Sequence, residues 1–273
     1  MRNGTRADSV NGSPQNMTLS RKFIAPLTVA ALGLGALPAF AQDRALAFSV
    51  TGGVATGPEY FGAGRNSVSP GGSFGFTGLS FGRVQLGNPD GPAQFATGTG
   101  ARGSLRFIPK RKGEKELAGL NDVKASLELG AGLHYTAEFW QVFADIRYGV
   151  IGHNAIAGEL GANAIYRGAD GLVVHAGPRA GFGNARFARS YFGVTPAEAA
   201  ASGLAAYTPS GGIHSVGLEV GVYQPLNDDW GITGTLRYDR LRGDAAASPI
   251  VRQGSRDQMG ASIGVTRHFN FRF

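Results

Sequence analysis

The chain has 273 residues, of which 44 are glycine and none is cysteine, and its formal net charge is +7. Without cysteine, the sequence excludes a disulfide framework, a thiolate metal site and a cysteine nucleophile. The glycines keep no three-residue period, which excludes a collagen-like fibre, and 10% aromatic residues are too many for a disordered chain.

The first 41 residues have the features of an export signal preceded by a short extension. From Met17 the sequence runs through a basic pair at 21–22 and an apolar stretch over 23–37 to an A-x-A cleavage motif ending at Ala41. This stretch is about 15 residues long, whereas a spanning helix needs about 20. We therefore predict a presequence over 1–41, with the start at Met17 and cleavage after Ala41, and an exported domain over 42–273.

The charge of the exported domain is mild. Residues 42–273 contain 22 basic and 18 acidic side chains, which leaves a formal charge of +4. Nucleic-acid binding would require basic residues clustered on one element, and no such cluster is present. We therefore expect no nucleic-acid partner.

The first part of the exported domain is predicted to hold five strands, near 45–56, 66–76, 79–87, 92–97 and 99–108. The alternation of apolar and polar residues that marks a strand is weak here. Glycine and proline are frequent between 66 and 97, and both weaken a strand interior. The register of this stretch is therefore the least defined part of the domain.

The clearest strands lie in the middle of the chain. Between 123 and 135 apolar residues occupy every second position, and Lys124 and Glu128 stand on the opposite face. The run over 140–148 repeats the pattern, with Asp145 and Arg147 on its polar face. Such alternation places one face of each strand in an apolar medium.

Five later segments alternate in the same way, around 156–166, 172–182, 215–222, 230–239 and 263–273. Together with the middle strands, their predicted polar face carries charges of both signs. These are Lys124, Arg147, Arg179 and Arg237 with Glu128, Asp145, Glu159, Glu219 and Asp239. Aromatic residues near the strand ends fit an interfacial girdle. They are Tyr135, Trp140, Tyr148, Tyr166, Trp230 and Tyr238.

Strands of about ten residues with an apolar outer face and a polar inner face are typical of a transmembrane barrel. Backbone groups in lipid must be paired, so the sheet must close, and bacterial barrels use an even number of strands. Counting back from Phe273 as a periplasmic end, long and short connections alternate. We predict an all-β fold, a closed antiparallel transmembrane β-barrel of about twelve strands, with ten as the alternative. It should have short periplasmic turns and longer extracellular loops.

The loop over 184–210 contains a helix-start signal. Thr195 and Glu198 form a capping box with Pro196 at the first helical position, and Gly203 ends the segment. We predict a single short helix there. Because long ordered loops in such scaffolds carry binding functions, this loop is the first place to look for one.

No catalytic, metal or cofactor site is predicted. Ser73 and Ser80 stand in glycine-rich G-x-S-x-G stretches, but these lack the strand-turn-helix context that a serine nucleophile requires. The five histidines show no zinc-binding spacing. The lysine-rich loop over 110–115 is either a solvated loop or a contact for anionic lipopolysaccharide.

The last strand alternates phenylalanines up to the final residue. Phe269, Phe271 and Phe273 all point to the predicted lipid face. This row resembles the C-terminal signal by which outer-membrane barrels are recognised for assembly, and we predict that role for it.

Several stretches together resemble the MipA/OmpV family of outer-membrane proteins. They are GPEYFG over 57–62, GLNDVKASLELG over 119–130, YFGVTPAEAAASGLAAYTP over 191–209 and LRGDAAASPIVR over 241–252. The resemblance singles out three loop motifs. Their residues are Pro58, Tyr60, Phe61, Gly62, Tyr191, Phe192, Gly193, Thr195, Pro196, Gly243, Asp244, Ser248 and Pro249. The lysine-rich 109–116 segment departs from the family pattern, which puts surface partners in doubt but not the fold.

This resemblance implies a non-enzymatic scaffold in the Gram-negative outer membrane that links a murein lytic transglycosylase to a bifunctional murein synthase. Two alternatives stay open. One is a narrow pore or small-solute channel, and the other is a surface adhesin linked to envelope stress. No cofactor is implied, and the lipid and lipopolysaccharide of the membrane are expected partners.

Overall fold

The computed structural model describes residues 44–81, 84–87 and 95–273, so the predicted presequence and its cleavage after Ala41 lie outside the described residues. The described chain forms one antiparallel sheet of eleven strands. The strands are β1 (Ala45–Pro58), β2 (Asn66–Phe81), β3 (Val84–Gly87), β4 (Gly98–Ile108), β5 (Ser126–Thr136), β6 (Trp140–Ile151), β7 (Ile156–Arg167), β8 (Val173–Gly183), β9 (Gly212–Pro225), β10 (Trp230–Leu241) and β11 (Asp257–Arg272).

Five short helical segments occur in the connections within the described part of the chain. They are η1 (Lys115–Leu117), α1 (Ala185–Phe192), α2 (Pro196–Ser202), α3 (Gly243–Ala247) and α4 (Pro249–Gln253). Among the described residues, no helix has both the length and the hydropathy that crossing a bilayer requires.

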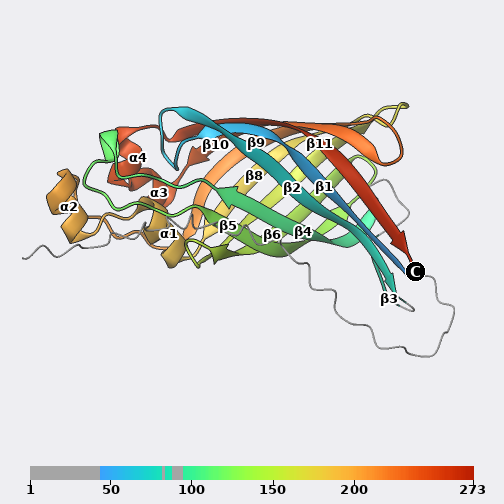
Figure 1. The fold of residues 1–273 in the computed structure, drawn as a ribbon, viewed down its shortest axis with the longest axis horizontal. Helices are drawn as coiled ribbons and strands as arrows, with labels where there is room; N and C mark the ends of the chain where they lie inside the picture. Colours follow the sequence, from blue (N-terminus) through green and yellow to red (C-terminus); the bar gives the residue numbers. More distant parts are fainter. Residues whose placement is uncertain (1–43, 82–83, 88–94) are drawn as a thin grey trace, which may run out of the picture. The chain divides into compact units, whose positions relative to one another are not determined.

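The sheet curls into a barrel because its first long strand pairs with its last. β1 and β11 form a twelve-residue antiparallel register from Ala45↔Arg272 to Thr56↔Ala261. From β11 each strand pairs with its predecessor down to β4, and β1 pairs with β2 on its other side (Figure 1). The prediction of an all-β antiparallel barrel is confirmed.

The described residues hold ten long strands and the four-residue β3, which fits the alternative count of ten better than twelve. The difference arises in the glycine- and proline-rich stretch. The predicted strands 66–76 and 79–87 are largely one strand, β2, followed by β3. In the segment predicted as a strand over 92–97, residues 95–97 form no strand, and 92–94 lie outside the described residues.

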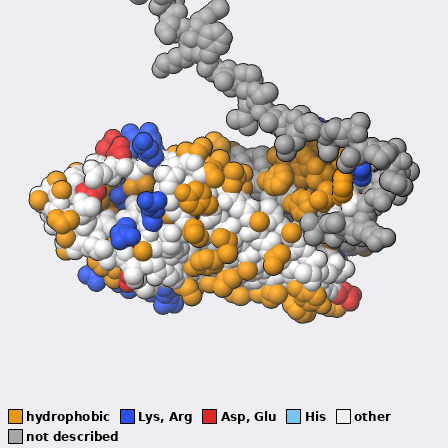
Figure 2. Space-filling view, turned by 90° about the horizontal axis from the view of Figure 1, so that it is seen from below, with side chains coloured by type: hydrophobic (Ala, Val, Ile, Leu, Met, Phe, Trp, Pro, Cys, Tyr) orange, Lys and Arg blue, Asp and Glu red, His pale blue; other side chains and the backbone are white. Residues whose placement is uncertain are grey.

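The two faces of the wall differ as the alternation predicts. On β6, Val142 and Ile146 are exposed on the outer face, whereas Asp145 and Arg147, which flank Ile146, are buried. Hydrophobic side chains cover the strands on the face seen in Figure 2, and charged side chains gather toward the end that carries the helices. The outer wall is therefore apolar and the lumen, the space inside the barrel, is polar.

Aromatic residues ring the end of the barrel where the chain terminates. Tyr135 and Trp140 lie 5.4 Å apart between ring centroids, and Tyr166 and Trp230 are exposed at the same end. Tyrosine and tryptophan favour the membrane interface because they combine an apolar ring with a polar group. Phe271 of β11 and Phe273, which follows the strand, are exposed, but the role of the phenylalanine row as an assembly signal stays a prediction.

Connections of two kinds leave the barrel at opposite ends (Figure 1). Short turns over 137–139, 168–172 and 226–229 lie at the end of the C-terminus. The other end carries the connections over 59–65, 109–125, 152–155, 184–211 and 242–256. We call these five connections together the loop cap. The end at which each of these connections lies matches the predicted order, although 152–155 in the loop cap is as short as the turns at the other end.

Candidate functional site: the loop cap and the lumen

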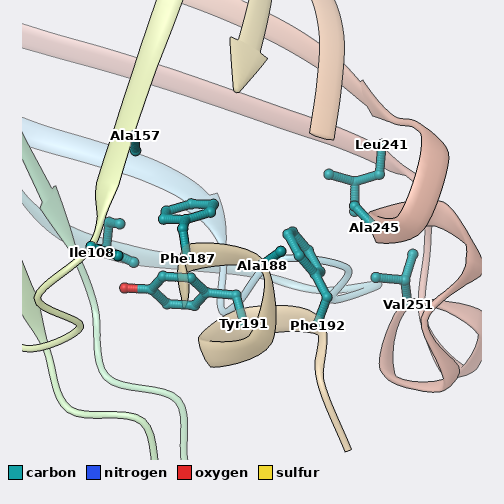
Figure 3. Close-up of a cluster of buried hydrophobic side chains, with 10 residues drawn as sticks. Ile108, Ala157, Phe187, Ala188, Tyr191, Phe192, Leu241, Ala245 and Val251 are labelled. Carbon is teal, nitrogen blue, oxygen red and sulfur yellow. The ribbon is translucent and has the colours of Figure 1, made fainter. Parts of the chain in front are cut away.

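The loop cap has its own hydrophobic core at the mouth of the barrel. Phe187, Tyr191 and Phe192 of α1 are buried and pack with Leu241 and Val251 (Figure 3). Phe187 and Tyr191 lie on the same side of the helix because they are four residues apart, and the same holds for the buried Ala188 and Phe192. Asn184 starts the helix by accepting a hydrogen bond from the Phe187 backbone N–H at 3.0 Å. This helix was not predicted.

The first loop motif enters this core from the connection between β1 and β2. The Phe61 ring lies 5.0 Å from the ring of Tyr191 and 5.9 Å from that of Phe187, in edge-to-face arrangements that aromatic pairs prefer. Gly62 follows with φ of +95°, and a Cβ there would lie 2.6 Å from Val251 Cγ2. Its N–H donates to Gln258 Oε1 at 2.9 Å. The motif thus packs the first loop against the last.

The second motif provides α1, α2 and the link between them. The predicted capping box is present: Thr195 accepts from the Glu198 N–H, and Glu198 accepts from the Thr195 N–H. Glu198 Oε1 also accepts from the Asn121 N–H at 2.9 Å. One carboxylate therefore starts α2 and ties it to the loop between β4 and β5. Pro196 opens the helix and Gly203 ends it with φ of +75°.

The third motif connects the last loop to the second. Ser248 is fully buried, and its hydroxyl donates to the Phe192 carbonyl at 2.7 Å while it accepts from the Ile250 N–H. The Asp244 carboxylate accepts from the N–H and the hydroxyl of Ser210, both at 2.6 Å. Gly243 is the first residue of α3 and adopts φ of +51°, and Pro249 opens α4.

The structure therefore brings the three predicted loop motifs together in one place, although they are up to about 190 residues apart in the sequence. Most of their contacts join one loop to another. The motif residues therefore hold the loop cap in shape. Among the described residues, no group of histidine and acidic side chains is placed to hold a metal ion.

The lysine-rich segment has two parts. Lys110 and Lys112 are exposed, as a solvated loop would have them. Arg111 between them is buried, and its Nη1 donates to the Tyr191 carbonyl at 3.0 Å. Arg111 is thus part of the interior of the loop cap. Neither the alternation of residues nor the count of charges in the sequence predicts this burial.

Ionisable groups of the cap are shifted by the same contacts. Burial, together with the Glu116 carboxylate, raises the pKa of Tyr60 to about 12. Hydrogen bonds from Ser210 lower the pKa of the Asp244 carboxyl. Both shifts favour the protonation state present at neutral pH.

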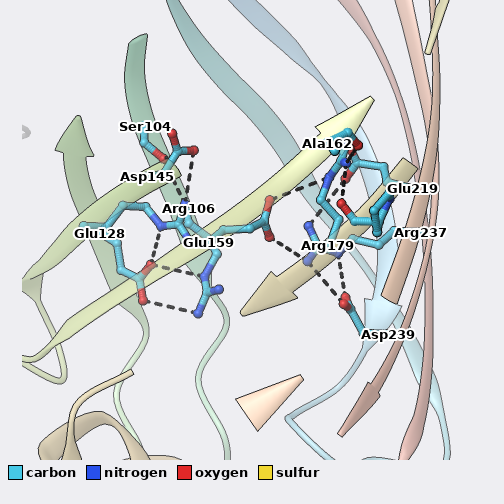
Figure 4. A network of polar contacts seen from close by, with 12 residues as sticks. Ser104, Arg106, Glu128, Asp145, Glu159, Ala162, Arg179, Glu219, Arg237 and Asp239 are labelled. Atoms are coloured by element: carbon cyan, nitrogen blue, oxygen red, sulfur yellow. Dashed lines mark hydrogen bonds and ion pairs between the residues drawn. The ribbon is translucent and has the colours of Figure 1, made fainter. Parts of the chain in front are cut away.

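Below the cap, charged side chains cross the lumen in two groups (Figure 4). In the first, Glu128 lies 3.0 Å from Arg147 and 3.2 Å from Arg106. In the second, Arg237 Nη2 lies 2.6 Å from Glu159 and Arg179 Nη2 lies 2.8 Å from Glu219. The predicted inward charges are therefore largely paired with one another.

One inward charge was predicted wrongly and two were missed. Lys124 precedes β5 and is exposed, so it is not part of the lumen. Arg102 and Arg106 of β4 take its place, pairing with Asp145 and Glu128. Lys124 continued the alternation of β5 beyond the end of the strand, and β4 has too many glycines for its alternation to stand out.

A cavity of about 670 Å³ lies among these groups. Charged residues from several strands line it, and Phe61 and Tyr191 of the loop cap close one side. Phe95 lines another part, with its ring 4.9 Å from that of His175. Ser73 lines the cavity too, but Ser73 and Ser80 lie within β2 and not on a strand-to-helix turn.

Comparison with known proteins gives consistent matches. The family described as MltA-interacting protein MipA matches residues 50–269. Outer membrane protein Omp26La of Vibrio anguillarum is 30% identical over 148 residues, covering 53% of this chain and 56% of that protein. The MltA-interacting protein of Escherichia coli K12 is 31% identical over 157 residues, covering 54% and 59%.

Outer membrane protein OmpV of Vibrio cholerae serotype O1 is 41% identical over a shorter stretch of 73 residues, 27% of this chain and 28% of that protein. The chain therefore spans 28 to 59% of the length of these three relatives.

Proposed function

Since the chain belongs to the MipA family and is an outer-membrane β-barrel protein, we propose that it is a non-enzymatic interaction protein. In this proposal it is a scaffold that holds a murein lytic transglycosylase, and with it a bifunctional murein synthase, at the outer membrane. A relative named MltA-interacting protein supports the first partner. The second partner rests on the family resemblance alone.

The observation that carries the proposal is that the path along the barrel axis is obstructed. The loop cap packs over one end of the lumen, and paired charges cross the space below it. Ion pairs of this kind favour a packed interior over a selective aqueous path. A barrel that is closed to solutes is suited to work through its surfaces.

The turns at the C-terminal end would face the partner, because the predicted topology puts them in the periplasm. Their tips carry exposed acidic residues, among them Glu138, Asp170 and Asp228. The turns are short, whereas a standard interface buries about 800 Å² per partner. We therefore expect a modest contact with a basic face of the enzyme.

A pull-down tests this arrangement. The detergent-purified protein should retain the cognate lytic transglycosylase, and the variant Glu138→Lys/Asp228→Lys should retain less of it because like charges then face each other. The matched control Glu114→Lys/Glu116→Lys also reverses two exposed acidic charges, but in the loop cap, and should bind normally. If the unmodified protein retains no enzyme, the scaffold proposal is wrong.

The loop cap supports a second proposal, contact with the anionic groups of lipopolysaccharide. Its outer surface has more exposed basic than acidic side chains. The basic residues are Arg65, Lys110, Lys112, Lys115, Lys124, Arg186, Arg189, Arg242, Arg252 and Arg256. Binding to lipopolysaccharide vesicles should exceed binding to neutral phospholipid vesicles and should weaken as salt is raised. Equal binding to both would contradict it.

A further inference from the structure

The wall of the barrel has one junction without a backbone ladder. Among the described strands, every neighbouring pair around the barrel is hydrogen-bonded except β2 and β4, which are adjacent but unpaired. On this side β2 pairs only with the short β3, through Gly78 to Phe81. The edges of β2 and β4 between the loop cap and β3 therefore face each other without a ladder.

Side chains make the contact across this junction. A Cβ at Gly103 of β4 would lie 3.0 Å from Cδ1 of the Phe74 ring of β2, so the ring rests on the glycine. Val50, the register partner of Phe74 on β1, is exposed on the outer wall, and so is Phe107 on β4. Phe74 and Gly103 thus belong to the outer face.

The lumen cavity reaches the same place. Besides inward residues, its lining includes outward residues of the two strands, namely Phe74 and Phe76 of β2 and Gly103, Leu105 and Phe107 of β4, and also Met259 of β11. The cavity therefore extends to the unpaired edges of β2 and β4. Irregular backbone at membrane depth is tolerated where it lines a cavity, because elsewhere unpaired backbone groups in lipid are costly.

We propose that the junction between β2 and β4 is a lateral opening through which a single-chain amphiphile with an anionic head enters the lumen from the bilayer. The aromatic and aliphatic side chains of the opening would contact the apolar chain. The volume of the cavity is in the range of small-molecule sites. This proposal is independent of the scaffold function.

We assign an anionic head group to the ligand because Arg102, a basic residue of β4, lies on the lumen side of the opening. Arg102 follows the outward Ala101 and precedes Gly103 on β4, and its side chain is 34% exposed, more than that of Arg106, Arg147, Arg179 or Arg237. Its ion pair with Asp145 is 3.2 Å long, and its guanidinium lies 4.2 Å from the Phe143 ring centroid. A partly exposed guanidinium can accept a carboxylate or phosphate in addition.

Closing the opening tests the route. The chain has no cysteine, so Phe74→Cys/Gly103→Cys can be linked by a short bis-maleimide without side reactions. The unlinked double variant in phosphatidylcholine vesicles should bind oleate, and linking should reduce binding about tenfold. The matched control is Val220→Cys/Leu236→Cys, which joins register partners of the hydrogen-bonded β9 and β10 and should bind oleate equally with and without the linker. Equal binding by the linked and unlinked β2/β4 variant would overturn the proposal.

A second experiment does not depend on that variant. A diazirine-labelled fatty acid should label peptides of β2 and β4 in the unmodified protein above the rest of the wall. Arg102→Gln should weaken oleate binding about tenfold and leave binding of oleyl alcohol unchanged, since only oleate has the anionic head. Uniform labelling of the wall, or an equal loss for both probes, would contradict the opening or the assigned head group.

Discussion

At the scale of single residues, two glycines of the first loop motif stand in opposite environments. A Cβ at Gly57 would meet nothing within 4 Å, whereas one at Gly62 would lie 2.9 Å from Val251 Cα, in a backbone of φ +95°. We expect Gly62→Ala to cost roughly 1–3 kcal/mol of stability and Gly57→Ala to be nearly neutral. Urea unfolding in detergent micelles measures both. Equal effects would mean that the loop cap does not depend on this close approach.

The ion pairs in the lumen should contribute more to the stability of the protein than those on the surface. Arg147→Met removes a buried partner from Glu128, which is itself fully buried, and should cost roughly 3 kcal/mol. Arg65→Met removes an exposed pair with Glu116 and should cost about 0–1 kcal/mol. The same unfolding experiment compares the two. A small effect at Arg147 would show that Arg106 and His153 suffice to hold Glu128.

Tyr60 should make the stability of the loop cap depend on pH in alkaline solution. Burial and Glu116 raise its pKa from about 10 to about 12, so the folded state favours the neutral phenol. That contribution is complete below pH 10 and is lost as the pH rises through about 12. The difference in tyrosinate absorbance between the parent and Tyr60→Phe reports the titration. Glu116→Gln should move the pKa back toward its ordinary value, and an unshifted titration in the parent would refute the assignment.

Side-chain direction was the property best predicted from single residues. On β6 every second residue faces the lumen because a strand has a period of two, and burial of Asp145 and Arg147 follows from it. The period does not say where a strand begins, which is why Lys124 was placed in the lumen. Nor does it reveal that Arg111 turns inward, because a loop has no period.

At the scale of elements, the capping box of α2 joins local and tertiary structure. Thr195→Ala removes the cap of α2 and should lower the free energy of opening of this helix by about 1 kcal/mol. Thr195→Ser keeps the hydroxyl and should leave that free energy unchanged. Glu198→Ala should cost more, because Glu198 also accepts from the Asn121 N–H. Hydrogen exchange of the α2 amides measures this opening. Identical exchange in all three variants would show that packing alone holds the helix.

The elements themselves were predicted unevenly, for physical reasons. α2 was predicted because its start is a local signal, and α1 was missed although Asn184 and the Phe187/Tyr191 spacing carry a weaker one. In β2 the glycines and Pro70 hide the alternation, so one strand was divided. Ladder partners lie far apart in the sequence, and no local pattern indicates that β2 and β4 stay unpaired.

At the scale of the whole molecule, the barrel was predictable because lipid imposes a closed antiparallel sheet and an apolar outer wall. The convergence of the three motifs was not, since their meeting depends on which loops share an end and how they pack. The alternation of the connections predicted which loops share an end of the barrel. How these loops pack is shown only by the structure, in the contacts of Phe61 with the α1 aromatics and of Ser248 with Phe192.

The resulting molecule has two barriers in series along its axis, the loop cap and the lumen ion pairs, and we expect it to conduct almost no current in planar bilayers. Replacing residues 185–210 by a glycine-serine linker should open only the first barrier. Adding Glu159→Ser/Arg237→Ser removes a balanced pair joined at 2.6 Å and should then give measurable conductance. The heat-modifiable mobility of each variant shows that its barrel has folded. Steady current through the unmodified protein, or through the linker variant alone, would instead favour the channel over the scaffold, because the ion pairs would then not block the path.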